Sequence, residues 1–400
     1  MPLDLQTQPH PLLSLNERKL LDILRRRGAI TRATVSTEMD LAQQSVHRLI
    51  EELISHGLLR SGERVKNGRG QPSPRIELVN EAVYAIGVSI NTDSAVVCIA
   101  DLGCNVLEQI TLRTPPLSRN STLDSLENAI EQMLQRNGID ADRVIGIGFA
   151  IAGFFLQNRQ INAPEPLRDW SLMDLQPVLE ERFGLPVWLE NNATTAAIGE
   201  SLVGVGAWAS NFIYLSFNFG FGAGVVINGK PYFGSHGNAG EITLFNDEES
   251  INRPAMRFLL DELHKNGVQV DSIEDLRARF DPDWPGVDTW LKRVQPTLDR
   301  LVNALAGLFD PQAVVFGGQM PPELGRRLIA ATTFWGTHRY NSPPPRPQLL
   351  LSETNGNAAA IGAALVPLKD RFFCLMFRRR KPSWMTCDTR AAVWLTHKGC

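Results

Sequence analysis

An acid and two amides follow an apolar run near the middle of the chain, and these residues have the clearest chemical potential. The run PVWL ends in Glu190, Asn191 and Asn192, and a segment of helical composition follows. Ligands of open α/β sheets bind where strands end and helices begin, so these side chains predict a small-molecule site. Amides and carboxylates offer paired donors and acceptors to adjacent hydroxyl groups. Alternatively, Asn191 and Asn192 only cap a helix starting at Ala193, and both roles can coexist.

Glycines are concentrated soon after this stretch, between residues 220 and 240. Two β-prone runs there are joined through Asn228-Gly229, a dipeptide typical of two-residue hairpin turns. Glycine allows the backbone to come close to a ligand, so this segment could form part of the same site. The alternative is that these glycines serve tight turns only.

Composition indicates a soluble globular protein of two or three domains. The chain has 400 residues, 43% of them hydrophobic, and no run approaches the length of a membrane span. The N-terminus lacks the basic and apolar regions of a signal peptide, which predicts a cytoplasmic protein. Five cysteines without a CxxC pair predict reduced thiols and no structural zinc site.

Charge is unevenly distributed along the chain. From Ser14 to Leu78 there are 12 Lys and Arg against eight Asp and Glu, a net charge of +4. The remaining 28 basic and 35 acidic residues give −7. A small basic module is therefore joined to an acidic body, which favours a nucleic-acid partner for the module although the whole chain carries −3.

The basic module, residues 14–79, has the order of a winged helix-turn-helix. Apolar spacing predicts three helices, over 16–27, 31–39 and 43–56. Candidate wing strands follow at 58–61 and 75–79. In such a module the third helix lies in the major groove of DNA, and the wing contacts the backbone or the minor groove.

The polar face of the third predicted helix carries side chains able to hydrogen-bond base edges or phosphates. They are Gln43, Gln44, Ser45, His47 and Arg48. Arg69 and Gln71 lie in the basic wing, and an arginine there can enter a narrow A·T-rich minor groove. A solvated helix face and a plain linker are the alternatives for these two segments.

Beyond residue 80 the pattern of strands and helices occurs twice in outline. The first set consists of β-prone runs at 84–90, 95–101, 106–112 and 144–153, helices at 122–135 and 172–183, and a strand ending at Glu190. The second set has β-prone runs at 212–217, 222–227, 230–233 and 313–316. This repetition predicts an α/β fold with two lobes, 81–195 and 196–368, around a cleft.

From about Ser14 to Leu368 the chain resembles the ROK family (repressors, open reading frames and sugar kinases), in its DNA-binding regulator branch. The motifs that carry the resemblance are GRGQPSP after the helix-turn-helix, IGVSI near 86, ENNATTAAIGE at 190–200, FGAGVVINGK at 221–230, GNAGEI at 237–242, VVFGG at 314–318 and NGNAAAIGAAL at 355–365. The resemblance implies a winged helix-turn-helix followed by a duplicated actin/hexokinase-like (ribonuclease H-like) domain, whose last helix returns to the first lobe. It also implies sugar in the cleft and, in the kinases, ATP on the second lobe.

Three motifs of this chain differ from those of the family's kinases at the positions that carry out phosphoryl transfer. Asn192 replaces the aspartate that accepts the proton of the sugar hydroxyl, and an amide cannot take that proton. The first phosphate loop, D-x-G-G-T in kinases, runs here from Ser89 to Asp93 without its acid and both glycines. In the second loop Gly-Thr has become Asn218-Phe219, whose ring takes space that a phosphate needs. No catalytic residue is expected, and the lobes are interpreted as a sensor.

No metal ion or other cofactor is expected. The family usually follows GEIGH with zinc-binding cysteines, whereas here GEITL continues as FNDEESINRPAM, and Leu244 replaces the histidine that contacts zinc and sugar. The resemblance assigns sugar binding to Asn191, Asn192 and Glu241. It also places Asn162 in a loop that closes over the sugar.

The sequence therefore predicts a sugar- or polyol-responsive transcriptional regulator, a repressor of a carbohydrate utilisation operon without kinase activity. Its expected partners are operator DNA, a small carbohydrate effector and further copies of the chain in a homodimer or homotetramer, with no membrane. Closure of the lobes on the carbohydrate would change the spacing of the DNA-binding modules. The protein would be associated with the nucleoid when bound to its operator.

Two other hypotheses remain open at this point. An active ATP-dependent sugar kinase with a DNA-binding extension would need Asp93 or Glu190 to replace the missing base. A regulator that responds to another protein would have lost sugar binding altogether. The tail at 369–400 has no clear periodicity and is assigned no function.

Overall fold

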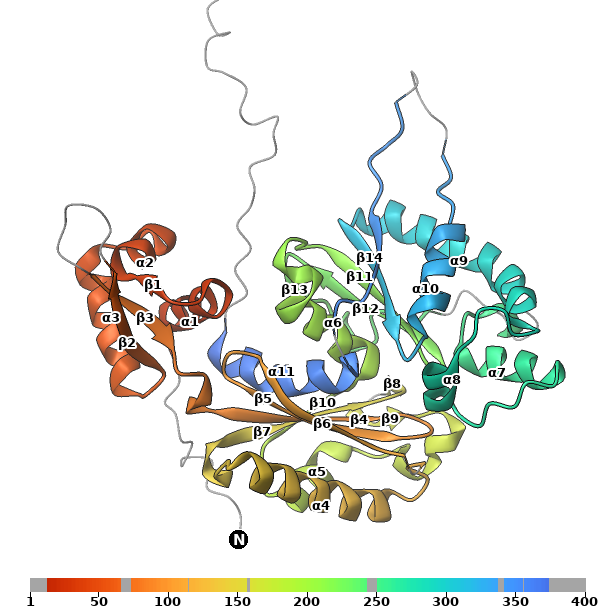
Figure 1. Ribbon diagram of the computed structural model, residues 1–400, viewed down its shortest axis with the longest axis horizontal. Helices are drawn as coiled ribbons and strands as arrows, with labels where there is room; N and C mark the ends of the chain where they lie inside the picture. Colours follow the sequence, from red (N-terminus) through yellow and green to blue (C-terminus); the bar gives the residue numbers. More distant parts are fainter. Residues whose placement is uncertain are drawn as a thin grey trace, which may run out of the picture.

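The computed structural model describes residues 13–65, 73–113, 115–156, 159–242, 250–336, 342–354 and 356–373. Figure 1 shows a small N-terminal module beside a larger body, in which two sheets lie on either side of two packed helices. These helices are α6 (Asn192–Val203) and α11 (Ala358–Phe372). Within the described ranges, no helix has the length and apolar composition of a transmembrane span.

The N-terminal module contains three helices and a three-stranded antiparallel sheet. Its elements are α1 (Leu15–Arg27), β1 (Ile30–Thr31), α2 (Arg32–Met39), α3 (Gln43–Ser55), β2 (Leu59–Val65) and β3 (Ser73–Leu78). Ser14 and Glu17 form a reciprocal capping box on α1, and Thr31 caps α2. The predicted winged helix-turn-helix order is confirmed. The wing strands are longer than predicted because pairing continues past a register shift beyond Ser61.

The module shares an apolar core with the body. Leu20, Leu21 and Leu24 of α1 belong to one buried cluster with Phe372 and Phe373 at the end of α11. Full burial of a leucine or phenylalanine side chain contributes about 1.5–3 kcal/mol. The orientation of the module on the body is therefore set by side-chain packing as well as by the connecting chain.

The first lobe is built on a five-stranded mixed sheet with the order β10-β7-β4-β5-β6. Its strands are β4 (Tyr84–Ile90), β5 (Ala95–Asp101), β6 (Val106–Leu112), β7 (Val144–Ile151) and β10 (Val187–Asn191). Helices α4 (Arg119–Asn137) and α5 (Leu175–Phe183) cover one face, and α11 covers the other (Figure 1). A short hairpin of β8 (Phe154–Phe155) and β9 (Ile161–Asn162) follows β7.

The second lobe has a sheet with the order β13-β12-β11-β14-β15. Its strands are β11 (Phe212–Phe217), β12 (Phe221–Ile227), β13 (Lys230–Pro231), β14 (Ala313–Gly318) and β15 (Gln348–Leu351). Helix α6 lies on one face. The other face is covered by α7 (Met256–Lys265), α8 (Ile273–Arg279), α9 (Val287–Phe309) and α10 (Pro322–Ala331). The predicted hairpin turn is present, since both Asn228 and Gly229 have positive φ angles.

The two sheets have the same topology, strand for strand. In each, three consecutive antiparallel strands are extended by two parallel ones, and the first strand of the set lies at the centre. The predicted fold class, a duplicated two-lobe α/β domain after a winged helix-turn-helix, is confirmed. The sequence pattern did not predict β15, because its four residues follow a proline-rich stretch and are too few to show a period.

Helices α6 and α11 cross at a distance that requires small residues. A Cβ on Gly362 of α11 would lie 1.8 Å from the carbonyl oxygen of Thr195 in α6. A Cβ on Gly148 of β7 would lie 1.8 Å from that of Ala363, and Gly224 of β12 meets the first turn of α6 in the same way. The first sheet, α11, α6 and the second sheet therefore form one close-packed stack.

We expect Gly362→Ala to destabilise the protein by about 2–3 kcal/mol or more, because the added methyl group collides with backbone that cannot rotate away. Thermal unfolding followed by circular dichroism measures the loss. Gly307→Ala in α9 is the matched control, since nothing lies within 4 Å of its added Cβ. That variant should be neutral or more stable by about 0.5–1 kcal/mol, and equal melting temperatures of the two variants would contradict the close crossing.

Candidate functional site

A cavity of about 250 Å³ lies between the two lobes, at the ends of strands from both sheets. It takes one wall from the ends of β4, β7 and β10 and the other from the β11–β12 turn and the end of β14. The structure brings all four residues predicted for ligand binding to this cavity. They are Asn162, Asn191, Asn192 and Glu241.

Asn191 caps α6 and also ties the two lobes together. Its Oδ1 accepts a hydrogen bond from the backbone N–H of Ala193 at 2.7 Å, which is the capping role considered from the sequence. Its Nδ2 donates to the carbonyl oxygen of Gly153 at 2.5 Å and to Glu241 Oε1 at 3.3 Å. Both amide hydrogens are therefore used, and only one lone pair of Oδ1 stays open to a ligand.

Asn192 is held by the end of β4 and is 4% exposed. Its Nδ2 donates to the carbonyl oxygen of Ile90 at 3.1 Å, and its Oδ1 accepts from Ser89 Oγ at 3.3 Å. The side chain thus has a fixed orientation at the cavity wall. An amide in this position can orient a hydroxyl group but cannot remove its proton.

Glu241 and Asn162 face the cavity from opposite lobes. Glu241 is exposed as a residue, but desolvation of its carboxyl group raises its pKa to about 7, while the positive charge of Arg253 acts in the opposite direction. Asn162 belongs to β9, and its Oδ1 accepts a weak hydrogen bond from Ser171 at 3.4 Å. Nearby, Asn238 of the second lobe exchanges two hydrogen bonds of 2.8 Å with the backbone of Phe155, which holds the β8–β9 hairpin against that lobe.

Sequence reasoning missed several polar residues that line the cavity. Asn91 follows β4 and Gln319 follows β14, and each is 4% exposed. Asn91 Nδ2 and Gln319 Oε1 have no hydrogen-bond partner in the part of the chain that the structure describes. The rule that found Asn191, namely polar residues at the ends of central strands, would have found both of these.

Two arginines line the cavity, Arg253 and Arg257, and no pattern in the sequence predicted this position for them. Arg253 lies in the segment that replaces the family's cysteine cluster, and Arg257 lies in the first turn of α7, so only the tertiary fold brings them to the strand ends. Leu244 lies outside the described residues. In the part of the chain that the structure describes, no group of three or more His, Cys, Asp or Glu side chains is arranged to hold a metal ion.

The two carboxylates considered as substitutes for the missing base are placed elsewhere. Asp93 Oδ2 accepts hydrogen bonds from the backbone N–H groups of Ile273 at 2.9 Å and Glu274 at 3.1 Å, at the start of α8. Burial raises the pKa of Glu190 to about 7, but this residue does not line the cavity. Among the described residues, Glu241 is the only carboxylate in the cavity wall.

The residues predicted to contact DNA form the exposed face of α3. Gln43, Gln44, Ser45, His47 and Arg48 are all exposed, whereas Val46, Ile50 and Leu53 are buried. His47 has a hydrogen-bond partner on the surface, since its Nδ1 lies 2.8 Å from Nη1 of Arg32. Arg32 also donates a hydrogen bond to Glu51. Arg69 and Gln71 of the wing lie outside the described residues.

We expect Glu241→Gln to raise the stability of the folded protein more at about pH 8 than at about pH 5. The pKa of Glu241 in the folded protein is about 7, above its ordinary value of 4.5, so the folded state binds the proton more strongly. Wild-type stability therefore falls as the pH rises from 4.5 through 7, and glutamine removes this loss. Thermal unfolding of both proteins across this range gives the difference.

Glu165→Gln, which removes a carboxylate from the exposed surface, is the control for the loss of a negative charge as such. A stability difference between wild type and Glu241→Gln that stays constant with pH would contradict the raised pKa.

The sequence of this chain is similar to those of several known proteins. The model of the ROK family matches residues 85–246. An uncharacterised protein of Sinorhizobium fredii, y4fQ, is 27% identical over 369 residues, covering 91% of this chain and 93% of that protein. The xylose repressor of Bacillus spizizenii is 28% identical over 232 residues, covering 57% of this chain and 59% of the repressor. The N-acetylglucosamine repressor of Escherichia coli is 24% identical, covering 57% and 56%.

Solved structures show the same fold. A ROK family transcriptional regulator, a homologue of the E. coli MLC protein, superimposes with a TM-score of 0.67 at 21% identity, covering 89% of this chain and 96% of that one. A ROK family glucokinase from Streptomyces griseus, in complex with glucose and AMPPNP, gives a TM-score of 0.54 at 23% identity over 70% of this chain and 98% of the kinase.

Proposed function

Because this chain belongs to the ROK family, we propose that it is a carbohydrate-responsive repressor of transcription. Its winged helix-turn-helix binds operator DNA, and a small sugar or polyol in the cavity between the lobes releases it. One observation carries the proposal: an exposed polar recognition helix is joined to a cavity where an amide, Asn192, occupies the position of the kinases' base. The names of the xylose and N-acetylglucosamine repressors support carbohydrate control of this kind.

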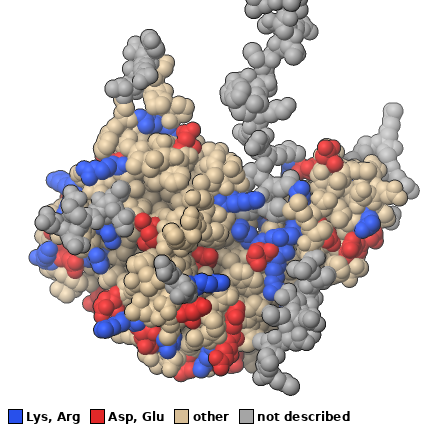
Figure 2. Space-filling view, turned by 180° about the vertical axis from the view of Figure 1, so that it is seen from behind, with Lys and Arg blue, Asp and Glu red and all other residues tan. Residues whose placement is uncertain are grey.

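The charge distribution supports DNA binding through the module rather than through the body. On the face of the molecule in Figure 2, acidic and basic side chains are mixed over the surface of the body. The module carries the net positive charge, and α3 presents Gln44 and Arg48, types that hydrogen-bond bases and phosphates. A homodimer or homotetramer would place two such helices on two half-sites of an operator.

The loss of kinase activity is supported by the positions of the carboxylates. Phosphoryl transfer needs a residue that accepts the proton of the sugar hydroxyl. Asp93 is bonded to the start of α8, and Glu190 stands outside the cavity wall. Phe219 lines the cavity in the loop where the kinases hold phosphate.

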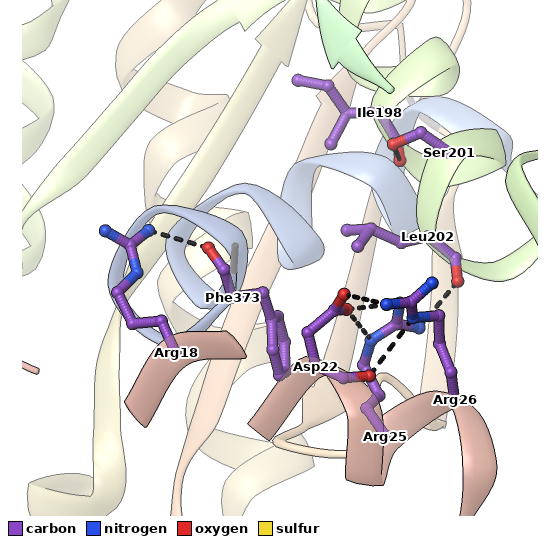
Figure 3. A network of polar contacts seen from close by, with 8 residues as sticks. All are labelled: Arg18, Asp22, Arg25, Arg26, Ile198, Ser201, Leu202 and Phe373. Carbon is purple, nitrogen blue, oxygen red and sulfur yellow. Dashed lines mark hydrogen bonds and ion pairs between the residues drawn. The ribbon is translucent and has the colours of Figure 1, made fainter. Parts of the chain in front are cut away.

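Helix α6 offers a physical connection from the cavity to the DNA-binding module. It begins at the cavity with Asn192 and ends beside α1, where Arg25 donates a hydrogen bond of 2.7 Å to the carbonyl oxygen of Leu202 (Figure 3). Arg25 is also paired with the buried Asp22. A cation is favourable at a helix C-terminus, so α1 is fastened to this end of α6. A ligand that moves α6 would therefore alter the position of α1.

We expect Gln44→Ala and Arg48→Ala each to weaken binding to the operator about tenfold, because each removes a side chain able to contact bases or phosphates. Fluorescence anisotropy with an operator fragment obtained by selection with the wild-type protein measures the affinity. Arg300→Ala, which removes an exposed arginine from α9, is the control for the loss of one positive charge. Equal affinity of all four proteins would contradict the role of α3.

The effector half of the proposal is tested by adding sugars, polyols and sugar phosphates to the protein–operator complex. We expect one class of carbohydrate to release the DNA, and Asn162→Ala to require about tenfold more of it while binding the operator normally without it. ATP with Mg²⁺ should be neither bound nor hydrolysed. Release by no carbohydrate would favour a regulator that responds to another protein, and turnover of ATP with a sugar would favour the kinase.

A further inference from the structure

The described wall of the cavity contains basic side chains that a neutral sugar does not require. Arg253 and Arg257 line it, and Glu241 is the only carboxylate that the described residues contribute. Helix α6 begins at the cavity as well, so its N-terminal dipole adds positive potential. Building on the proposed function, we infer that the effector is a carbohydrate with an anionic group, a phosphate or a carboxylate, and that Arg257 contacts this group.

Arg257 is held at the cavity wall by aromatic rings and has no hydrogen-bond acceptor among the described residues. It lies in the first turn of α7, with its guanidinium carbon 4.5 Å from the ring centre of Phe258 and 5.8 Å from that of Phe219. It makes no hydrogen bond or ion pair with any described residue, and its Nε is buried without a partner. A guanidinium offers five donors in a planar fork that matches a phosphate or carboxylate, so an anion would supply what the protein does not.

Arg253 stands close enough to act on Arg257 and Glu241. Burial lowers the pKa of Arg257 and the charge of Arg253 lowers it further, whereas Asp261 raises it without forming an ion pair. Two like charges at one cavity repel each other, and an anion bound beside them relieves this repulsion.

The uncharged part of the ligand has its own partners on both walls of the cavity. The amide groups of Asn91 and Gln319 are buried at the ends of β4 and β14, and each leaves one atom without a hydrogen bond to any described residue. Asn91 Nδ2 can donate to a hydroxyl oxygen, and Gln319 Oε1 can accept from a hydroxyl group. A sugar ring placed between these amides and the arginines would satisfy both walls.

The experiment compares matched ligands by calorimetric titration of the full chain. The panel consists of common pentoses and hexoses, each with its terminal phosphate and, for the hexoses, its uronate, together with inorganic phosphate alone. We expect one anionic carbohydrate to bind at least about tenfold more tightly than its neutral parent, as one charge-assisted hydrogen bond implies. We expect Arg257→Gln to remove this advantage while changing the affinity for the neutral parent less than about twofold.

Arg143→Gln is the matched control, because Arg143 also lies over an aromatic ring, that of Tyr84 at 5.1 Å, but outside the cavity. This variant should keep the preference for the anionic ligand. The melting temperature of free Arg257→Gln separates the two possible roles of Arg257. If the side chain of Arg257 only packs on Phe258, the variant has a lower melting temperature and binds charged and neutral ligands with equally reduced affinity. That result would overturn the inference.

The remaining outcomes are also decisive. A neutral sugar that binds as tightly as its charged forms and releases the operator would overturn the anionic ligand but leave the proposed regulator intact. Inorganic phosphate that binds as tightly as the sugar phosphate would show an anion site without a carbohydrate site. Binding of no member of the panel would overturn both the inference and the carbohydrate-responsive function on which it rests.

Discussion

The close crossing of α6 and α11 between the two sheets is the constraint on which the rest of the structure depends. Gly362 of α11 lies against the carbonyl oxygen of Thr195, and Gly148 of the first sheet lies against that of Ala363. Backbones that approach this closely gain many dispersion contacts and leave no space for water, so the layers resist separation. The alanine-rich composition of both helices is explained by this packing and needs no contact with a ligand. The crossing nevertheless decides where the first turn of α6 stands, and so where the cavity lies.

Because the crossing fixes α6 along its length, the two ends of this helix serve different parts of the molecule. At one end Asn191 caps the helix and lines the cavity. Near the other end the fully buried Glu200 accepts hydrogen bonds from Thr354 Oγ1 at 2.9 Å and the N–H of Val205 at 3.2 Å, which ties α6 to the segment before α11. The last turn then meets Arg25 of α1. A helix of 12 residues spans about 18 Å, so one rigid element joins the cavity to the DNA-binding module.

Much of the fold could be predicted from local sequence, because its central strands and helices carry strong periodic patterns. The strands at 84–90, 95–101 and 106–112 match the prediction residue for residue, whereas α5 begins three residues later than predicted because Asp174 caps it at Leu175. Part of the candidate site could also be predicted from the sequence, since the four residues predicted to bind ligand line one cavity. Asn91 and Gln319 obey the same strand-end rule, so the sequence held a signal for both. Arg253 and Arg257 could not be predicted, because only tertiary packing of α7 brings them to the strand ends.

The hydrogen bonds of Asn192 determine what would be needed to restore a general base at this position. Its Nδ2 donates to the carbonyl oxygen of Ile90, so an aspartate there would set a carboxylate oxygen against another acceptor with no proton between them. Asp93 is likewise bound to the second lobe through the N–H groups at the start of α8. An aspartate at position 192 would therefore need different hydrogen-bond partners at the end of β4. Under the proposed function, these same bonds give the cavity a fixed polar wall, which a sensor needs in order to distinguish one carbohydrate from another.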